Sequence, residues 1–363
     1  MTPSARSSSP FFPPVPVTIA FLGVTLFVLY LGWTMMQIPF LAWSGELSKR
    51  YHERTRVATY VQVISAAALL ATLIMPTIAD QLWPSNAPLK LAFMGGLVLA
   101  TLVPTLILTV RSFPDPQMID LPRTRLSPFA AIRVIGAEPL LRRVLASDFA
   151  VTLAQNIRAA LFVFFVAHYM GRPHWGSGLF LLQFVFGIFA GPIWMRIGYR
   201  FGKHRTAIAG ELAQVAINLG LLAVTPSAFP LLIGLTVAQG LAQGSGNLML
   251  RSIVADIADK HRLETGDDRT GLFFSVFSLS GKAATAVAVG IALPLVAWLG
   301  FDPKAARNSD AALTGLLLVF ALGPAIAHAF SALLIRGFAL DEAAHAEIRR
   351  QLDGRAVALS PAE

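Results

Sequence analysis

The sequence contains no cysteine and few charged residues. Of its 363 residues, 13% are Asp, Glu, Lys or Arg, whereas a typical soluble domain has about 25%. The lack of cysteine excludes disulfides, thiol nucleophiles and cysteine-ligated metals. The sequence also lacks a Walker loop, a Gly-x-Ser-x-Gly elbow and a His-Glu-x-x-His motif, and its 7 histidines are scattered. We therefore expect no catalytic residues, no metal site and no bound cofactor.

Long apolar runs dominate the chain, which is 55% hydrophobic. A helix rises 1.5 Å per residue, so about 20 apolar residues cross roughly 30 Å of hydrocarbon. This pattern predicts an all-α polytopic membrane protein with about nine transmembrane helices, which has the lipid bilayer as its environment. The predicted spans are 15–44, 57–82, 89–110, 145–170, 175–197, 206–226, 228–258, 270–299 and 311–338.

Lysine and arginine gather in alternate loops, such as 49–56 and 196–205, and are sparse in the loops between them. Basic loops stay in the cytoplasm. We therefore predict a multi-pass protein of the cytoplasmic (inner) membrane with its C-terminus inside, and the net charge of +9 needs no nucleic acid partner. Nine crossings would put the N-terminus outside, which predicts further helices upstream. Nothing in the sequence indicates an oligomeric state.

Residues 111–144 are polar and rich in proline, which predicts a linker between two helical bundles. Three predicted spans precede this linker and six follow it. The expected domains are an N-terminal tail (1–14), a partial N-terminal bundle (15–110), a cytoplasmic linker (111–144), a C-terminal six-helix bundle (145–338) and a cytoplasmic tail (339–363).

Two cations, Arg158 and Lys282, lie near the middle of predicted spans. A charge at that depth costs at least about 2.5–3.5 kcal/mol, so it faces a partner, a water-filled cavity or a ligand. Asp148 and Glu211 lie closer to the predicted cytoplasmic ends than these cations do. The two cations therefore indicate either a hydrated path for a solute or structural pairing within the bundle.

Polar residues recur at four-residue steps in the span 228–258, at Gln239, Gln243, Asn247 and Arg251. Such residues share one face of a helix and would line a polar path or bond neighbouring helices. In the first span, Trp33 and Gln37 lie one turn apart beside Pro39. This pair suits contact with a sugar, or a packed tryptophan whose N–H is bonded.

Acids and bases also gather at the predicted cytoplasmic ends. They suit a gate that breaks as a protein opens inward, or a solvated turn of little energetic value. The expected gate residues are Asp256, Asp259, Arg251, Arg200, Lys203 and Arg205.

One block of the sequence resembles the glycoside-pentoside-hexuronide:cation symporters of the major facilitator superfamily, and the resemblance extends over residues 12–352. The residues that carry it are Arg251-Ser-x-x-Ala255-Asp256-x-x-Asp259, Glu264-Thr-Gly266, Arg269-x-Gly271-x-Phe273-Phe274-Ser275 and Lys282. The resemblance implies a major-facilitator bundle with sugar and cation sites. Lys282 matches a lysine of the family's eleventh helix. Gln37 stands where the family often has an aspartate, and the first span matches the family's fourth helix.

These observations favour a secondary active transporter that works by alternating access, with cation-coupled symport of a sugar, glycoside or related small polar solute. The coupling ion would be Na⁺ or H⁺. The expected substrate and coupling residues are Lys282, Gln37, Trp33, Arg158, Gln239, Gln243 and Asn247.

Two alternatives stay open. One is a truncated, transport-inactive remnant. The other is an intramembrane prenyltransferase-type enzyme, in which Asp256 and Asp259 would hold a magnesium diphosphate.

Overall fold

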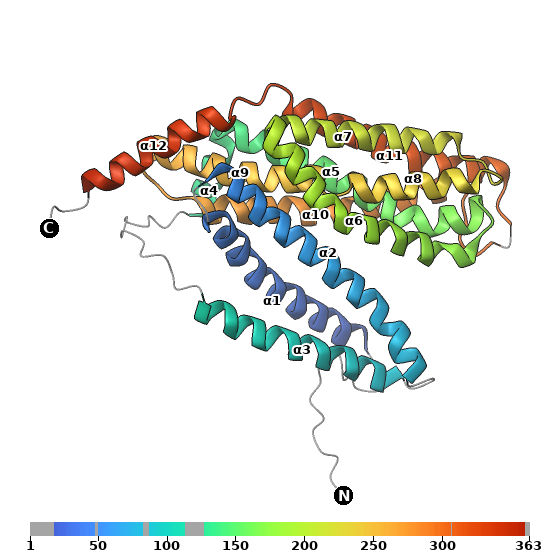
Figure 1. Ribbon diagram of the computed structural model, residues 1–363. Coiled ribbons are helices and arrows are strands. Elements are labelled where there is room, and N and C mark those ends of the chain that lie inside the picture. Colours follow the sequence, from blue (N-terminus) through green and yellow to red (C-terminus); the bar gives the residue numbers. More distant parts are fainter. Residues whose placement is uncertain (1–17, 48–49, 83–86, 113–126, 306, 360–363) are drawn as a thin grey trace, which may run out of the picture. The chain divides into compact units, whose positions relative to one another are not determined.

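The computed structural model describes residues 18–47, 50–82, 87–112, 127–305 and 307–359 (Figure 1). Helices and their connecting turns make up these ranges, and no strand occurs within them. The predicted N-terminal tail, 1–14, lies outside the described residues. The helices are α1 (Ile19–Glu46), α2 (Tyr51–Leu82), α3 (Ala87–Ser112), α4 (Pro128–Ala137), α5 (Pro139–Phe164), α6 (Gly176–Phe201), α7 (Lys203–Gly220), α8 (Phe229–Ala242), α9 (Ser245–Thr265), α10 (Thr270–Trp298), α11 (Asp310–Ile335) and α12 (Glu342–Leu359).

Six helical segments in the described part of the chain are long and apolar enough to cross a membrane. They are Ile19–Leu41, Pro139–Tyr169, Pro173–Phe201, Lys203–Ala223, Thr270–Trp298 and Asp310–Ile335. Each of these overlaps a predicted span, because a long apolar run has few other stable forms in hydrocarbon. The all-α membrane fold is thus confirmed, while the number of nine crossings stays a prediction.

Parts of the predicted linker and of the predicted C-terminal tail are helical. The part of the linker after residue 126 forms α4 and the first turns of α5. Ser127 caps α4 by accepting a hydrogen bond from the Ala130 N–H at 3.2 Å, and Pro128 occupies the first turn. Residues 342–359 of the predicted tail form α12, which packs against α9.

The chain divides into two compact units, and the division falls inside α1 and α2. The first unit contains residues 1–40 and 67–123, and the second contains 41–66 and 124–363. The end of α1 and the first half of α2 therefore belong with the C-terminal helices. The domain limits predicted from the sequence stay a prediction.

In the second unit, α5 packs against both α10 and α11, α7 packs against α11, and α6 packs against α8 (Figure 1). The core between α5 and α11 is aromatic. Phe165 stacks on Phe320 with ring centroids 4.4 Å apart, and Phe162 lies tilted against the same ring. Large apolar side chains such as Leu279 and Ile326 are exposed, as expected where helices meet lipid.

The predicted span 228–258 is two helices rather than one. Helix α8 ends at Ala242 and α9 begins at Ser245. Between them Gln243 is extended and Gly244 has φ +82°, a left-handed conformation that favours glycine. Gln239, Gln243, Asn247 and Arg251 therefore do not share one continuous helical face. Broken helices of this kind often lie at solute sites in transporters.

Gly240 permits close contact between α8 and α6. A side chain at this position would collide with the Gln183 carbonyl oxygen and with Phe186. Gly234, on the same helix, has nothing within 4 Å of the position its Cβ would occupy. The two glycines of α8 thus differ in how closely neighbouring atoms approach them.

We expect Gly240→Ala to lower the unfolding temperature, because overpacking a tight contact costs about 1–3 kcal/mol. Gly234→Ala should be neutral or slightly stabilising, since alanine favours helix over glycine by up to about 1 kcal/mol. Intrinsic tryptophan fluorescence during heating of the detergent-solubilised protein measures both. Equal unfolding temperatures for the two variants would contradict the close α6–α8 contact.

Candidate functional site

A small polar cavity lies inside the second unit, between α5, α6 and the α8–α9 break. Its volume is about 60 Å³, which leaves room for a few water molecules. Four glutamines and one arginine line it together with phenyl rings. The lining residues are Gln155, Arg158, Ala159, Phe162, Phe180, Gln183, Phe184, Gln239 and Gln243.

Arg158 is the only charged residue in the described lining of this cavity. Its Nη1 donates a hydrogen bond of 2.9 Å to Asn218 Oδ1, and its guanidinium carbon lies 5.2 Å from the centre of the Phe320 ring. Its Nε and Nη2 groups find no hydrogen-bond acceptor among the described residues, and no described carboxylate pairs with it. A buried guanidinium with unused donors suits a ligand that supplies oxygen acceptors.

The amides of the cavity connect α5, α6 and α9. Gln183 donates to Gln243 at 3.2 Å, and Gln155 donates to Asn247 at 2.9 Å. Asn247 in turn donates to Asp148 at 3.2 Å. Gln239 is buried, and its Oε1 atom has no donor among the residues described. The cavity therefore offers both unused donors and an unused acceptor.

Three of the residues predicted to bind a solute come together here, namely Arg158, Gln239 and Gln243. Asn247 is adjacent through its bond to Gln155. Lys282 is half-buried near the middle of α10 and is not in the described lining. Trp33 and Gln37 lie on α1 in the first unit, where Trp33 is 57% exposed. The roles of all seven residues stay predictions.

Sequence reasoning missed Gln155, Gln183 and the phenyl rings of the cavity. Single glutamines and phenylalanines inside apolar spans carry no distinctive spacing, because phenylalanine is common in any membrane helix. Only the arrangement of α5, α6 and α8 around one cavity brings them to one place. Arg158 could be predicted from the sequence because a charged residue near the middle of an apolar span is conspicuous.

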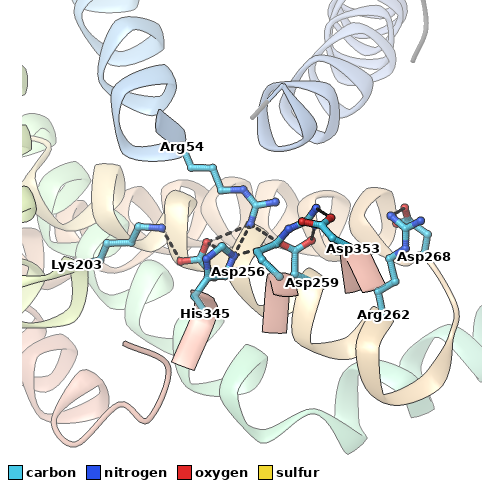
Figure 2. Close-up of polar contacts among 9 residues, drawn as sticks. Arg54, Lys203, Asp256, Asp259, Arg262, Asp268, His345 and Asp353 are labelled. Atoms are coloured by element: carbon cyan, nitrogen blue, oxygen red, sulfur yellow. Dashed lines mark hydrogen bonds and ion pairs between the residues drawn. The ribbon is translucent and has the colours of Figure 1, made fainter. Parts of the chain in front are cut away.

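A second polar site joins four helices at the end of the unit where α12 packs (Figure 2). We call this group the α12 cluster, and its members are Arg54, Lys203, Asp256, Asp259, His345 and Arg349. Lys203 Nζ lies 2.5 Å from Asp256 Oδ2, and Arg54 Nη1 lies 3.1 Å from Asp256 Oδ1.

Asp259 completes the cluster. Its Oδ2 atom lies 2.7 Å from Arg54 Nη1 and 3.1 Å from His345 Nε2, and its Oδ1 atom lies 3.3 Å from Arg349 Nη1. Figure 2 shows the cationic side chains converging on the two aspartates from α2, α7 and α12. The cluster therefore ties the first half of α2 to three C-terminal helices.

The α12 cluster is buried, and each of its two aspartates is paired with cations. Lys203, Asp256 and His345 are each 1% exposed. Burial by itself raises the pKa of Asp259, but the hydrogen bond from His345 and the charges of Arg54 and Arg349 outweigh it and hold this pKa well below its usual value. For Arg54, burial by itself lowers the pKa. The charges of Asp259 and Asp256 outweigh this effect, so the pKa of Arg54 is raised. Both groups are thus held in their charged forms.

Of the predicted gate residues, Asp256, Asp259 and Lys203 lie in the α12 cluster. Arg251 instead interacts electrostatically with Asp148. Arg200 and Arg205 are exposed, and Arg200 lies 5.5 Å from the Phe201 ring. Arg54, His345 and Arg349 were missed, because their segments precede a span or follow the last one and local spacing gives no sign of their partners.

The cluster also bears on the enzyme alternative. A magnesium diphosphate would need free oxygens on Asp256 and Asp259. Each described oxygen of these two carboxylates already faces a cationic or imidazole group. The geometry therefore favours structural ion pairing over metal binding for the two aspartates.

We expect Asp256→Asn to lower the unfolding temperature markedly, because removing one member of a buried ion pair costs about 3–5 kcal/mol. Asp353→Asn is the matched control. Asp353 also pairs with Arg349, at 2.9 Å, but its side chain is 57% exposed, and such surface pairs contribute about 0–1 kcal/mol. Thermal unfolding of both variants in detergent measures the difference. Similar losses in the two variants would contradict the buried character of the cluster.

Comparison with known proteins gives one family and several relatives. The family described as MFS/sugar transport protein matches residues 7–342. The uncharacterized symporter YjmB of Bacillus subtilis (strain 168) is 26% identical over 339 residues, which cover 89% of this chain and 70% of YjmB. The sodium-dependent lysophosphatidylcholine symporter 1-A of Danio rerio is 24% identical over 211 residues, which cover 58% of this chain and 39% of that protein.

A solved structure has the same fold. It is the crystal structure of a bacterial homologue of the iron transporter ferroportin in an outward-facing state. Its TM-score is 0.65 at 16% sequence identity, and the match covers 87% of this chain and 72% of that one. At this identity the likeness concerns the fold alone.

Proposed function

The chain belongs to the MFS/sugar transport protein family, and on this premise we propose that it carries a sugar, glycoside or related small polar solute across the cytoplasmic membrane by cation-coupled symport. Its family and its relatives are transporters, so the chain is a multi-pass secondary transporter and not an enzyme. The solute, the coupling ion, the inner-membrane location and the cytoplasmic C-terminus are part of the proposal.

The polar cavity carries the proposal about the solute. Arg158 Nε and Nη2 can donate and Gln239 Oε1 can accept, and none of these atoms has a hydrogen-bond partner among the described residues. Sugars present dense hydroxyl groups that both donate and accept. Phe162, Phe180 and Phe184 add apolar faces of the kind that C–H groups of a sugar ring contact. These features support Arg158, Gln239 and Gln243 as binding residues.

The size of the cavity supports a conformational cycle. A volume of about 60 Å³ holds only a few waters, so a sugar ring requires the walls to move apart. The α8–α9 break provides a place for this movement, because Gln243 lines the cavity and Gly244 lies next to it at a positive φ. Lys282, Gln37 and Trp33 remain proposed contributors to solute binding or coupling.

The α12 cluster is proposed as the cytoplasmic latch of this cycle. Its ion pairs link α2 to α7, α9 and α12, and their geometry depends on all four helices staying together. Separation of α2 from α9 breaks the Arg54 pairs with both aspartates at once. A closed latch on this side is the arrangement that alternating access requires while the opposite side is open.

The solute proposal predicts uptake by the purified protein in proteoliposomes under an imposed Na⁺ or H⁺ gradient. The solutes to test are radiolabelled glucose, xylose, melibiose and glucuronate. For a transported solute, Arg158→Gln should weaken apparent affinity about 10- to 100-fold, because a hydrogen bond from a charged group contributes about 1.5–3 kcal/mol. Arg158→Lys keeps the positive charge and should therefore lose less apparent affinity than Arg158→Gln.

Arg172→Gln is the matched control, since Arg172 is an exposed arginine of the same unit that lies over the Phe229 ring. It should transport like the unchanged protein. Equal affinity in Arg158→Gln would contradict the binding role of Arg158. No uptake of any tested solute by well-folded protein would favour the transport-inactive alternative.

The latch proposal predicts that a cross-link between α2 and α9 stops transport. Thr55 Oγ1 and Ser252 Oγ lie 3.4 Å apart beside the cluster, so Thr55→Cys/Ser252→Cys would place two thiols next to each other. The chain contains no other cysteine to compete. Oxidation should abolish uptake, and a reductant should restore it. Thr55→Cys alone should be insensitive to oxidation, and full uptake by the cross-linked protein would exclude separation of α2 from α9.

A further inference from the structure

One face of α7 carries a buried line of polar side chains. Lys203, Glu211, Gln214 and Asn218 occupy it at steps that keep them on one side of the helix, and all four are at most 2% exposed. Burial of four such groups on a helix of an apolar bundle requires partners for each. Lys203, Glu211 and Asn218 have partners on α9, α11 and α5. Gln214 Oε1 has no hydrogen-bond donor among the described residues.

The two ends of this line reach the two polar sites. At one end Lys203 pairs with Asp256 in the α12 cluster. At the other end Asn218 accepts the hydrogen bond from Arg158 at the cavity. Fifteen residues separate Lys203 from Asn218, which corresponds to about 22 Å along a helix. Helix α7 therefore connects the proposed latch to the proposed solute site.

Glu211 lies between these two ends and pairs with His328 of α11. Glu211 Oε2 and His328 Nδ1 are 2.6 Å apart, and the side chains are 3% and 1% exposed. Gly246 of α9 leaves space for the carboxylate, because a side chain there would collide with Glu211 Oε1. At this distance one of the two groups donates a hydrogen bond to the other. A carboxylate and an imidazole can each take up a proton and so change charge.

The other charged groups near the pair are few. Asp148 of α5 interacts electrostatically with Glu211, and Arg251 of α9 interacts with Asp148. Helix α8 has no ionisable residue, and Arg196 and Arg200 of α6 are exposed. On α7, Lys203 is already paired with Asp256. Within the described residues, His328 is the group that Glu211 bonds directly.

We propose that the Glu211–His328 pair is a proton-binding site that couples proton movement to the transport cycle. This inference rests on the proposed function, and it identifies the coupling ion as H⁺. In the loaded form the pair carries one added proton, either on the carboxylate or on the imidazole. Release passes that proton to water and leaves a carboxylate beside a neutral imidazole. Uptake from the other side of the membrane restores the loaded form.

The position of the pair explains how its charge would act on both sites. Helix α7 is in contact with α9, which carries Asp256 and Asp259, and with α11, which carries His328. An unbalanced carboxylate at position 211 favours hydration and separation of α7, α9 and α11, since an unpaired buried charge is costly. A shift of α7 moves Lys203, which pairs with Asp256 in the latch, and Asn218, which bonds to Arg158 at the cavity.

The first test detects the proton directly and needs no solute. Infrared titration of the protein in proteoliposomes, in H₂O and D₂O, should show a carboxyl or carboxylate band that changes as the pH rises. Glu211→Gln should remove this band, and His328→Gln should shift its midpoint. Glu138→Gln is the matched control, because Glu138 is also buried and lies 3.8 Å from a histidine, His261. A titrating band that persists in Glu211→Gln overturns the proposal.

The second test measures coupling with whichever of glucose, xylose, melibiose or glucuronate the protein transports. An inward H⁺ gradient should accelerate uptake by the unchanged protein and by Glu138→Gln. Glu211→Gln should lose this acceleration yet keep solute exchange without a gradient, because exchange needs no net proton movement. If Glu211→Gln loses both the acceleration by the H⁺ gradient and the exchange without a gradient, Glu211 has a structural role only.

The outcomes separate the two proposals. Uptake driven by Na⁺ with no response to a H⁺ gradient overturns the proton site and leaves the transport function standing. If Glu211→Gln still accumulates solute in response to a H⁺ gradient, the proton site is likewise overturned and the transport function stands. If no tested solute moves, the transport proposal fails, and the infrared titration still decides whether Glu211 binds a proton. Thermal unfolding of each variant shows that the compared proteins are folded.

Discussion

A charge buried among membrane helices must be met by another group, and this requirement organises the second unit. At the α12 end, cations from three helices neutralise two aspartates of α9. Further along α7, Glu211 and His328 balance each other. At the cavity, Arg158 meets only an amide oxygen and an aromatic face among the described residues. Two of these three sites are complete within the protein, and the third leaves hydrogen-bonding capacity for a ligand.

The break between α8 and α9 provides the geometry that this ligand site needs. An unbroken helix through 228–258 would continue one face past the cavity. The extended Gln243 and the left-handed Gly244 instead turn the chain, so that Gln243 bonds to Gln183 across from Arg158. Gly240, one turn earlier, lets α8 approach the α6 backbone. The proposed movement of the cavity wall at Gly244 would therefore leave α8 held against α6 by the close contact at Gly240.

The sequence predicts the helices well, because an apolar run of more than about 20 residues in hydrocarbon must satisfy its own backbone. It predicts α4 and α12 poorly, because short amphipathic helices depend on what they pack against. Arg158, Gln239 and Gln243 could be found because polar groups at depth are conspicuous. The Glu211–His328 pair could not, since 117 positions separate its members and no local spacing links them. For the same reason the aspartates of the latch were identified but most of their cationic partners were not.

Helix α7 is the element that makes these separate sites one system. Coupling between distant sites requires an element with two arrangements that both sites bias. A rigid helix that holds Lys203 at the latch, Glu211 near its middle and Asn218 beside the cavity meets the structural part of this requirement. A solute that draws Arg158 away from Asn218 removes one restraint on α7, and a proton leaving Glu211 removes another. The pair of Lys203 and Asp256 is then the last of the three contacts that remains along this face. Its opening therefore depends on whether a solute is bound at Arg158 and a proton at Glu211.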